Sequence, residues 1–235
     1  MNPEKRRKLV IVADDYGIRD TVPVTLELVQ AGKIDRVAVL IREVSESDCE
    51  RLKATGIPID LHLDLRGLLA SGEQVEESVI TRLISFLFRL LSGRLTEARV
   101  AHVWREQIEM FREAFGRVPD GLNSHENVHY YPPFFRALIK LAHTHGIAYV
   151  RFGKHGVQAG SEKQLVAWIL SFLHRFSTKA FAALPRATSD TVTSLDWFGN
   201  GFREADFPGE GPIEVIVHPE RVEEYVALSA LPSSR

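Results

Sequence analysis

The sequence has one cysteine, no excess of charge of either sign and no long uncharged hydrophobic run. Cys49 is alone among 235 residues, so no disulfide can form within the chain and a reducing, cytoplasmic location is expected. The 29 basic and 31 acidic residues give a net charge of −2. This balance argues against a nucleic-acid partner, and we expect a small, neutral ligand instead.

The two most apolar stretches, residues 79–91 and 165–184, carry charged side chains, among them Arg82 and Lys179. They contain too many charges for a membrane span and are predicted to be amphipathic helices, so no membrane partner is expected. A basic cluster at residues 5–8 precedes an apolar segment of only five residues, which two aspartates follow. We therefore expect no secretion signal.

Short β-branched segments alternate with helical patterns along the whole chain. Strands are predicted at 9–13, 36–41, 57–65, 147–152 and 213–218, with a short one near 191–195. Helices are predicted at about 21–31, 46–54, 75–91, 99–115, 133–145 and 161–183. This alternation favours βα units around a parallel sheet or barrel, and we expect a single domain over residues 1–235. The fold expected is α/β, an irregular, TIM-like (β/α) barrel with predominantly parallel strands.

Polar side chains fall where the predicted strands end. They are Asp14, Asp15, His62, His125, Arg151 and His218. The carboxyl ends of parallel strands share one face of a barrel, and binding and catalytic sites are built on that face. Five separate segments are therefore expected to contribute to one site.

The segment IDLHLDL alternates strictly between polar and apolar residues. Asp60, His62 and Asp64 are expected on one side of a strand, with the leucines on the other. Three such groups would cost several kcal/mol if buried without partners. We therefore expect a polar or metal-bearing interior on their side and helices on the apolar side.

Residues 125–129 spell H-E-x-x-H, the pattern of zinc peptidases. That site requires a long helix, but Pro119 and Gly121 precede the pattern and Pro132-Pro133 follow it closely. The zinc peptidase is therefore the least favoured of three functional hypotheses. A strand end followed by a loop is the alternative context.

Five segments in order along the chain resemble the motifs of the YdjC-like carbohydrate deacetylase family. They are ADDYG (13–17), LHLDL (61–65), NSHENVHYYP (123–132), VR (150–151) and EVIVHPE (214–220). Three residues depart from that family's pattern, because Asn123 replaces an Asp, Asn127 a His and Glu220 a Gly. The two asparagines alter the surroundings of the site, and the substrate could differ accordingly.

The resemblance assigns a divalent metal ion to Asp15, His62 and His125. A carboxylate and two imidazoles suit Zn²⁺, Mn²⁺, Fe²⁺ or Co²⁺, and with water ligands also Mg²⁺, so Mg or Zn are both open. Asp14 is then expected to be the general base and His218 the general acid.

Four further residues are predicted to contact substrate. Arg151 would stabilise an oxyanion or hold a sugar hydroxyl, His129 would line the pocket, Tyr130 would stack on a sugar ring, and Asn127 would form the pocket wall.

The resemblance thus implies a metal-dependent hydrolase that removes an acetyl group from an N-acetylated sugar or a chitooligosaccharide-like substrate. The alternative is a non-catalytic carbohydrate-binding relative in which Asn123 and Asn127 mark an altered site. Trp168, Phe172 and Phe176 recur at helical spacing. This spacing is typical of a core face, and a contact in a homodimer or a lid over the sugar site are the other interpretations.

Overall fold

The structure is a computed structural model that describes residues 8–18, 20–65, 68, 93, 95–156, 164–197 and 210–230. The helix expected at 75–91 lies outside these residues. No helix among the described residues is long and apolar enough to cross a membrane.

Eight parallel strands form one sheet in the described part of the chain, in the order β5-β4-β3-β2-β1-β8-β7-β6. Their bounds are β1 Leu9–Tyr16, β2 Arg36–Val39, β3 Ile59–Leu63, β4 Gly121–Ser124, β5 Tyr149–Val150, β6 Lys154–His155, β7 Thr191–Ser194 and β8 Ile213–Val217. The first and last strands, β1 and β8, are neighbours at the centre of the sheet.

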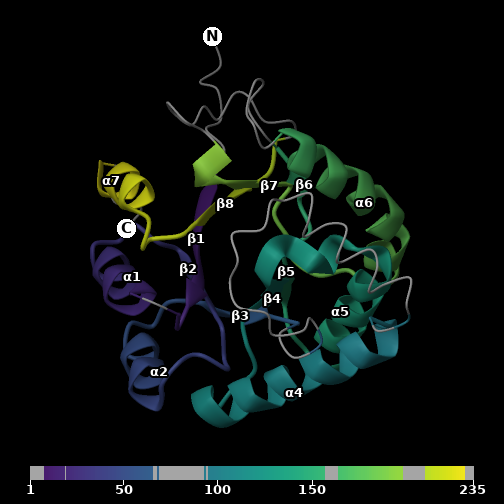
Figure 1. The fold of residues 1–235 in the computed structure, drawn as a ribbon, viewed down its shortest axis with the longest axis horizontal. Coiled ribbons are helices and arrows are strands. Elements are labelled where there is room, and N and C mark those ends of the chain that lie inside the picture. Colours follow the sequence, from purple (N-terminus) through teal and green to yellow (C-terminus); the bar gives the residue numbers. More distant parts are fainter. Residues whose placement is uncertain are drawn as a thin grey trace.

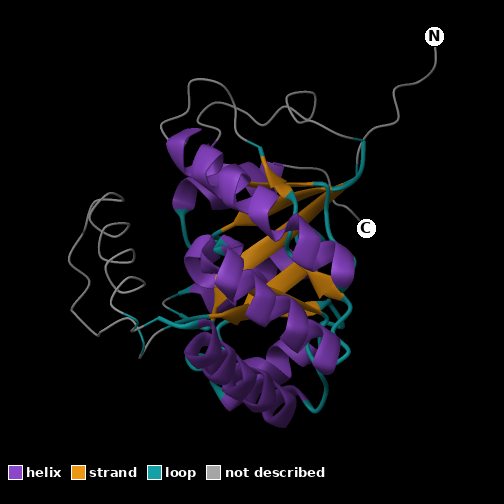
Figure 2. Cartoon of the chain, turned by 90° about the vertical axis from the view of Figure 1, so that its right-hand side faces the viewer, coloured by secondary structure: helices purple, strands orange, loops and turns teal. Residues whose placement is uncertain are grey.

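Helices surround the strands in chain order (Figure 1). They are α1 Thr21–Gln30, α2 Glu46–Lys53, α4 Glu97–Phe115, α5 Pro132–Thr144, α6 Gln164–Ala183 and α7 Val222–Ala230, with 3-10 elements η1 His125–Tyr130 and η2 Leu195–Trp197. Seen from the side of α5 and α6, the helices cover the strands (Figure 2). This arrangement confirms the predicted irregular α/β barrel.

The two edge strands of the sheet, β5 and β6, are consecutive in the chain and only residues 151–153 separate them. Ala187, which precedes β7, is also hydrogen-bonded to the chain at β5. Its N–H donates to the carbonyl of Ala148 at 3.0 Å, and its carbonyl accepts from Val150 N–H at 3.0 Å. On this side the barrel is therefore formed by two very short strands, β5 and β6. We call residues 151–153 the seam.

Local signals explain where several helices begin and end. The Ser45 hydroxyl accepts from the Asp48 N–H at the start of α2, and the Thr96 hydroxyl accepts from the Arg99 N–H at the start of α4. Such caps stabilise a helix by about 1 kcal/mol. The Thr96 cap places the start of α4 at Glu97, two residues earlier than predicted.

The polar side of β3 faces partnered groups, as the alternation predicted. Arg36 hydrogen-bonds Asp60 through Nε and Nη2, and its guanidinium lies 4.5 Å from the ring centroid of Tyr149. The Tyr149 hydroxyl in turn donates to Glu214 at 2.5 Å. These buried polar groups are thus linked inside the barrel, while Leu61 on the other side joins the hydrophobic core.

Three expectations about elements were wrong or incomplete. The strand β6 and the helix α7 were not predicted, since β6 is two residues long and α7 is a short helix after the last strand. The aromatic residues of α6 are not a core face. Trp168, Phe172 and Phe176 are 65%, 45% and 61% exposed.

His155 in β6 is a buried imidazole between aromatic rings. It is 8% exposed, its ring lies 4.5 Å from that of Tyr130 and 5.8 Å from that of Trp197, and neither ring nitrogen has a hydrogen-bond partner within the described chain. Burial, with the charges of Arg151 and His174, lowers the pKa of His155 to about 3. The folded protein therefore keeps this ring neutral.

This burial predicts acid sensitivity. An unfolded histidine takes up a proton near pH 6.5 while folded His155 does so only near pH 3, so the unfolding free energy should fall as the pH drops from about 6.5 to about 3. In urea titrations across this range, His155→Phe should remove up to about 1.4 kcal/mol per pH unit of the slope. His102→Gln, on an exposed face of α4, should leave the slope unchanged, and an equal effect of both variants would contradict the assignment.

Candidate metal centre and active site

The carboxyl edge of the barrel gathers the polar side chains that the sequence placed at strand ends. Asp14 and Asp15 lie near the end of β1, and His62 lies near the end of β3. The strands β4, β5 and β8 are directly followed by His125, Arg151 and His218, respectively. Ion-pair and hydrogen-bond contacts connect all six.

A distortion at the end of β1 turns two adjacent aspartates toward the same interior. The register of β1 against β2 shifts between Ala13 and Tyr16, and Asp15 adopts a left-handed backbone with φ 62°. Thr21 holds the turn, since its hydroxyl donates to the Asp15 carbonyl at 3.1 Å and accepts from Gly17 N–H at 3.2 Å. Neighbouring side chains of a regular strand would point to opposite faces.

Asp15, His62 and His125 form the candidate metal centre. Asp15 Oδ1 lies 2.8 Å from His125 Nδ1 and 3.2 Å from His62 Nε2. Each residue offers one ligand atom, and these atoms lie within 4.8 Å of one another. Burial raises the pKa of Asp15, but hydrogen bonds from His125 and His62 outweigh burial, so the pKa is held well below its usual range. The carboxylate is therefore charged and available as a ligand.

Asn123 orients His62 for this role. Its amide Oδ1 lies 2.5 Å from His62 Nδ1. An amide oxygen only accepts hydrogen bonds, so Nδ1 donates to it, and Nε2 is the nitrogen that faces Asp15 and would give up its proton to bind a metal ion. One carboxylate oxygen and imidazole nitrogens of this kind fit a divalent cation such as Zn²⁺.

Asp14 is fixed by a buried ion network. Arg151 donates to both of its carboxylate oxygens, at 2.7 and 2.8 Å, and uses its Nε to hydrogen-bond Glu214. Burial raises the pKa of Asp14, but the charge of Arg151 outweighs it and the pKa is lowered. His62 Nδ1 lies 3.9 Å from Asp14 Oδ2. A carboxylate that is ionised and fixed in direction thus stands beside the metal-ligand set.

His218 follows β8 and lies next to Asp15. Its Nε2 lies 3.9 Å from Asp15 Oδ2, and Glu224 in α7 accepts from its backbone N–H at 2.8 Å and lies 3.6 Å from its Nδ1. Burial lowers the pKa of His218, but the interaction with Glu224 outweighs it and the pKa is raised. The imidazolium form that can donate a proton is therefore favoured.

Three of the residues expected to contact substrate have other positions. Arg151 is fully buried with its guanidinium engaged by Asp14 and Glu214, so it does not face a substrate oxygen. His129 is fully buried between the Ser124 hydroxyl, 2.7 Å from Nδ1, and the Arg151 carbonyl, 3.0 Å from Nε2. The Tyr130 hydroxyl donates to the Gly153 carbonyl at 2.9 Å, and its ring is buried. Through these contacts His129 and Tyr130 hold η1 against the seam, of which Arg151 is a part.

Asn127, which was expected to form the pocket wall, lies in η1. It has a left-handed backbone with φ 53°, and its side-chain Oδ1 is buried without a hydrogen-bond partner within the described chain. A buried amide oxygen of this kind calls for a partner outside the protein.

Sequence reasoning missed Glu214 and Glu224, which hold Arg151 and His218. Glu214 carried a usable signal, because an acidic residue in the middle of the apolar strand IEVIV must find a buried partner. Glu224 carried none, since it belongs to a helix that was not predicted.

The geometry of η1 excludes the zinc-peptidase reading. Glu126 and Asn127 have φ values of 55° and 53°, so residues 125–130 do not form an α-helix. His125 and His129 do not share a face, and both ring nitrogens of His129 are occupied by protein atoms. The H-E-x-x-H letters therefore arise by coincidence.

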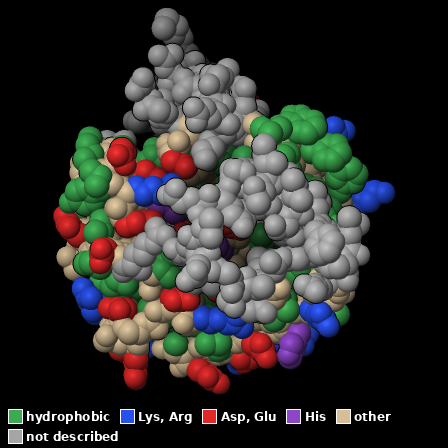
Figure 3. Space-filling view, in the orientation of Figure 1, with side chains coloured by type: hydrophobic (Ala, Val, Ile, Leu, Met, Phe, Trp, Pro, Cys, Tyr) green, Lys and Arg blue, Asp and Glu red, His purple; other side chains and the backbone are tan. Residues whose placement is uncertain are grey.

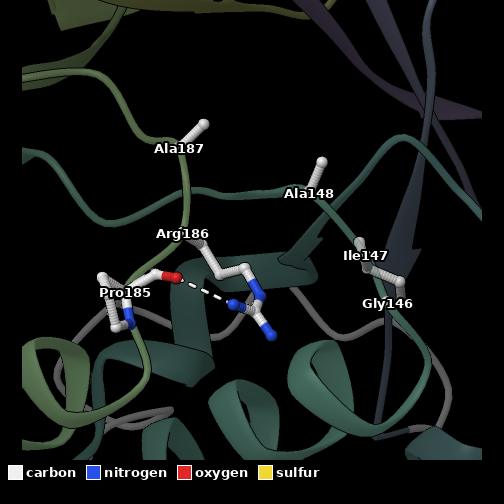
Figure 4. A pocket seen from close by; sticks show the side chains of 6 residues that line it. All are labelled: Gly146, Ile147, Ala148, Pro185, Arg186 and Ala187. Carbon is white, nitrogen blue, oxygen red and sulfur yellow. Dashed lines mark hydrogen bonds between the residues drawn. The ribbon is translucent and has the colours of Figure 1, made fainter.

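An open cavity of about 460 Å³ lies away from these residues (Figure 4). Its lining consists of Gly146, Ile147, Ala148, Pro185, Arg186 and Ala187. These residues precede β5 and β7, so the cavity opens at the amino ends of the strands. It contributes nothing to the candidate site.

Known proteins share both sequence and fold with this chain. A carbohydrate deacetylase from Danio rerio is 28% identical over 158 residues, which are 63% of this chain and 50% of that protein, so the match spans half of the relative's length. A chitooligosaccharide deacetylase from Salmonella paratyphi B is 28% identical over 251 aligned positions, covering 95% of this chain and 86% of that protein.

A crystal structure of an Enterococcus faecalis V583 protein proposed to cleave cellobiose phosphate shares the fold, with a TM-score of 0.60. Its sequence identity is 16%, and the match covers 91% of this chain and 81% of that one. The family model described as YdjC-like protein matches residues 8–232. The chain therefore belongs to the YdjC-like protein family.

Proposed function

We propose that this protein is a metal-dependent deacetylase that hydrolyses the acetamide of an N-acetylated sugar, with residues 1–235 as one catalytic domain. The observation that carries the proposal is the cluster of Asp15, His62 and His125, flanked by the ionised Asp14 and by His218. The names of the relatives support a carbohydrate substrate. The lone cysteine, Cys49, is consistent with action in the cytoplasm.

Asp15, His62 and His125 would hold the divalent ion. When bound, such an ion lowers the pKa of a ligated water towards about 7 and polarises the amide carbonyl. Zn²⁺ and Mg²⁺ are both candidates for this site.

Asp14 supplies the general base. Its carboxylate accepts the proton of the attacking water, and Arg151 fixes the orientation of this carboxylate by donating to both of its oxygens. His218 supplies the general acid, since the raised pKa keeps Nε2 protonated until the amine leaves. Base and acid thus both lie next to the residues that would hold the metal ion.

Asn127 contributes to binding the sugar. Its buried Oδ1 has no partner within the described chain, so it can accept a hydrogen bond from a sugar hydroxyl or from the acetamide N–H.

Asp15→Asn tests the metal centre directly. Purified protein, stripped with a chelator and reloaded with Zn²⁺, Mn²⁺, Co²⁺ or Mg²⁺, should hold about one equivalent of metal and release acetate from N-acetylglucosamine oligosaccharides. Asp15→Asn removes the charged ligand, so metal affinity should fall at least about tenfold and acetate release should be lost.

Asp20→Asn is the matched control, because Asp20 is exposed and makes no cap hydrogen bond at α1. It should keep both metal and activity. Saturable oligosaccharide binding without acetate from the metal-loaded protein would instead support the carbohydrate-binding alternative. Full metal retention in Asp15→Asn would refute the ligand assignment.

A further inference from the structure

The helix α6 presents an apolar face to solvent on the outside of the barrel. Leu165, Trp168, Phe172 and Phe176 are 60%, 65%, 45% and 61% exposed. Trp168 and Phe172 stack with centroids 5.7 Å apart and planes 12° apart, and Phe172 and Phe176 meet edge to face at 4.9 Å. In Figure 3 hydrophobic side chains gather where α6 lies, with basic side chains beside them. We call these four residues the aromatic face.

The Lys and Arg residues of α6 are not balanced by acidic residues of the same helix. No residue of α6 is acidic, whereas Arg175 and Lys179 are exposed on it. Residues 127–189 as a whole contain eight Lys or Arg and one acidic residue, Glu162, although the entire chain is nearly neutral. The positive charge is therefore concentrated in this part of the molecule.

Part of that charge is already neutralised elsewhere. Arg136 and Lys140 in α5 pair with Glu97, and Arg151 is buried inside the barrel. Arg175 and Lys179 belong to α6 itself. Lys179 lies two helical turns after Phe172, so its positive charge is on the same side of α6 as the aromatic face.

We propose that the aromatic face binds the surface of an anionic lipid bilayer. Tryptophan, phenylalanine and leucine side chains enter the headgroup boundary, and neighbouring Arg and Lys side chains reach the lipid phosphates. A symmetric contact between two copies of α6 would bring the cations of both copies together without an acidic residue of α6 to pair them. The charge therefore favours lipid over a second copy.

The topology places the helix α6, which carries this contact on its outer side, near the candidate site. The helix α6 follows β6, so it starts from the carboxyl edge of the barrel, and it packs against η1. Leu165 and Trp168 lie in its first half. The absence of a spanning segment led to the expectation of no membrane partner, but a helix that lies on a bilayer surface requires no such segment.

Tryptophan fluorescence of the full chain can test this contact. Trp104 and Trp197 are buried, at 0% and 8% exposed, so Trp168 is the tryptophan that can change its solvent. Vesicles of phosphatidylcholine with phosphatidylglycerol should shift its emission to the blue and carry the protein in flotation. Pure phosphatidylcholine vesicles should do so weakly, and raising the salt from about 0.05 M to about 0.5 M should release the protein.

Phe172→Ser/Phe176→Ser should weaken partitioning at least about tenfold, because two apolar rings no longer enter the headgroup boundary. Val222→Ser/Val226→Ser is the matched control, since these residues of α7 are 71% and 60% exposed and lie outside the aromatic face. The control pair should bind like the parent, and urea midpoints should show that both variants fold.

Three results would overturn the proposal. The first is the failure of anionic vesicles to bind the protein or to shift the emission. The second is an equal loss of binding in the α7 control pair. The third is a dimer of the parent chain that becomes monomeric in Phe172→Ser/Phe176→Ser, which would make the aromatic face an interface between copies.

Discussion

Asp14→Asn is expected to lower kcat for acetate release by a factor of about 10² to 10⁴ while leaving the metal content unchanged. The amide is nearly isosteric and its oxygen can still accept from Arg151, but it cannot take a proton from water. Acetate release at saturating oligosaccharide measures the first effect, and elemental analysis of the purified variant measures the second.

Glu126→Gln is the informative comparison for Asp14→Asn. Glu126 would be the general base of a zinc peptidase, but it lies in η1 with a left-handed backbone. This variant should retain deacetylation within about twofold. If Asp14→Asn kept its kcat and Glu126→Gln lost it, the assignment of the base would be wrong.

Arg151→Met is expected to lower the free energy of unfolding by about 3 to 5 kcal/mol. Arg151 is fully buried between Asp14 and Glu214. Its removal leaves two carboxylates inside the barrel without their cation, which costs far more than the loss of side-chain packing. Urea titrations at constant pH, compared at equal m-values, measure the change.

Two further variants decide whether the buried charges cause this loss. Arg151→Met combined with Glu214→Gln should be less destabilised than the sum of the single variants, because one stranded carboxylate has been neutralised. Arg136→Met removes an arginine that pairs with Glu97 at the surface, and it should cost no more than about 1 kcal/mol. Equal losses in Arg151→Met and Arg136→Met would contradict the explanation.

The sequence was sufficient to place the chemistry at one edge of the barrel. Asp14, His62 and His218 lie at or near the carboxyl ends of β1, β3 and β8, and the parallel order of the strands brings those ends together. The alternation of IDLHLDL likewise indicated a polar interior, in which Asp60 does pair with Arg36. The polar and apolar alternation within a strand and the alternation of strands with helices are both visible in the local sequence, so they could be predicted.

The roles of individual side chains depended on contacts that the sequence does not encode locally. The flanking Gly17 predicted a turn after the two aspartates. The left-handed backbone that redirects their side chains, however, is found at Asp15 itself. Arg151 and His129 follow strands, as binding residues often do, yet both are fully buried by partners far along the chain. Burial of this kind is decided by tertiary packing.

The pairing of β1 with β8 also has a consequence for how the protein is made. Val12 in β1 stands opposite Ile216 in β8, so the middle of the sheet is completed only by a strand that lies about 200 residues later in the chain. Contacts of such high sequence separation slow folding, because a long loop must close before they form. A nascent chain emerging from the ribosome would therefore expose one edge of β1, and chaperone dependence during synthesis should be greatest just before β8 appears.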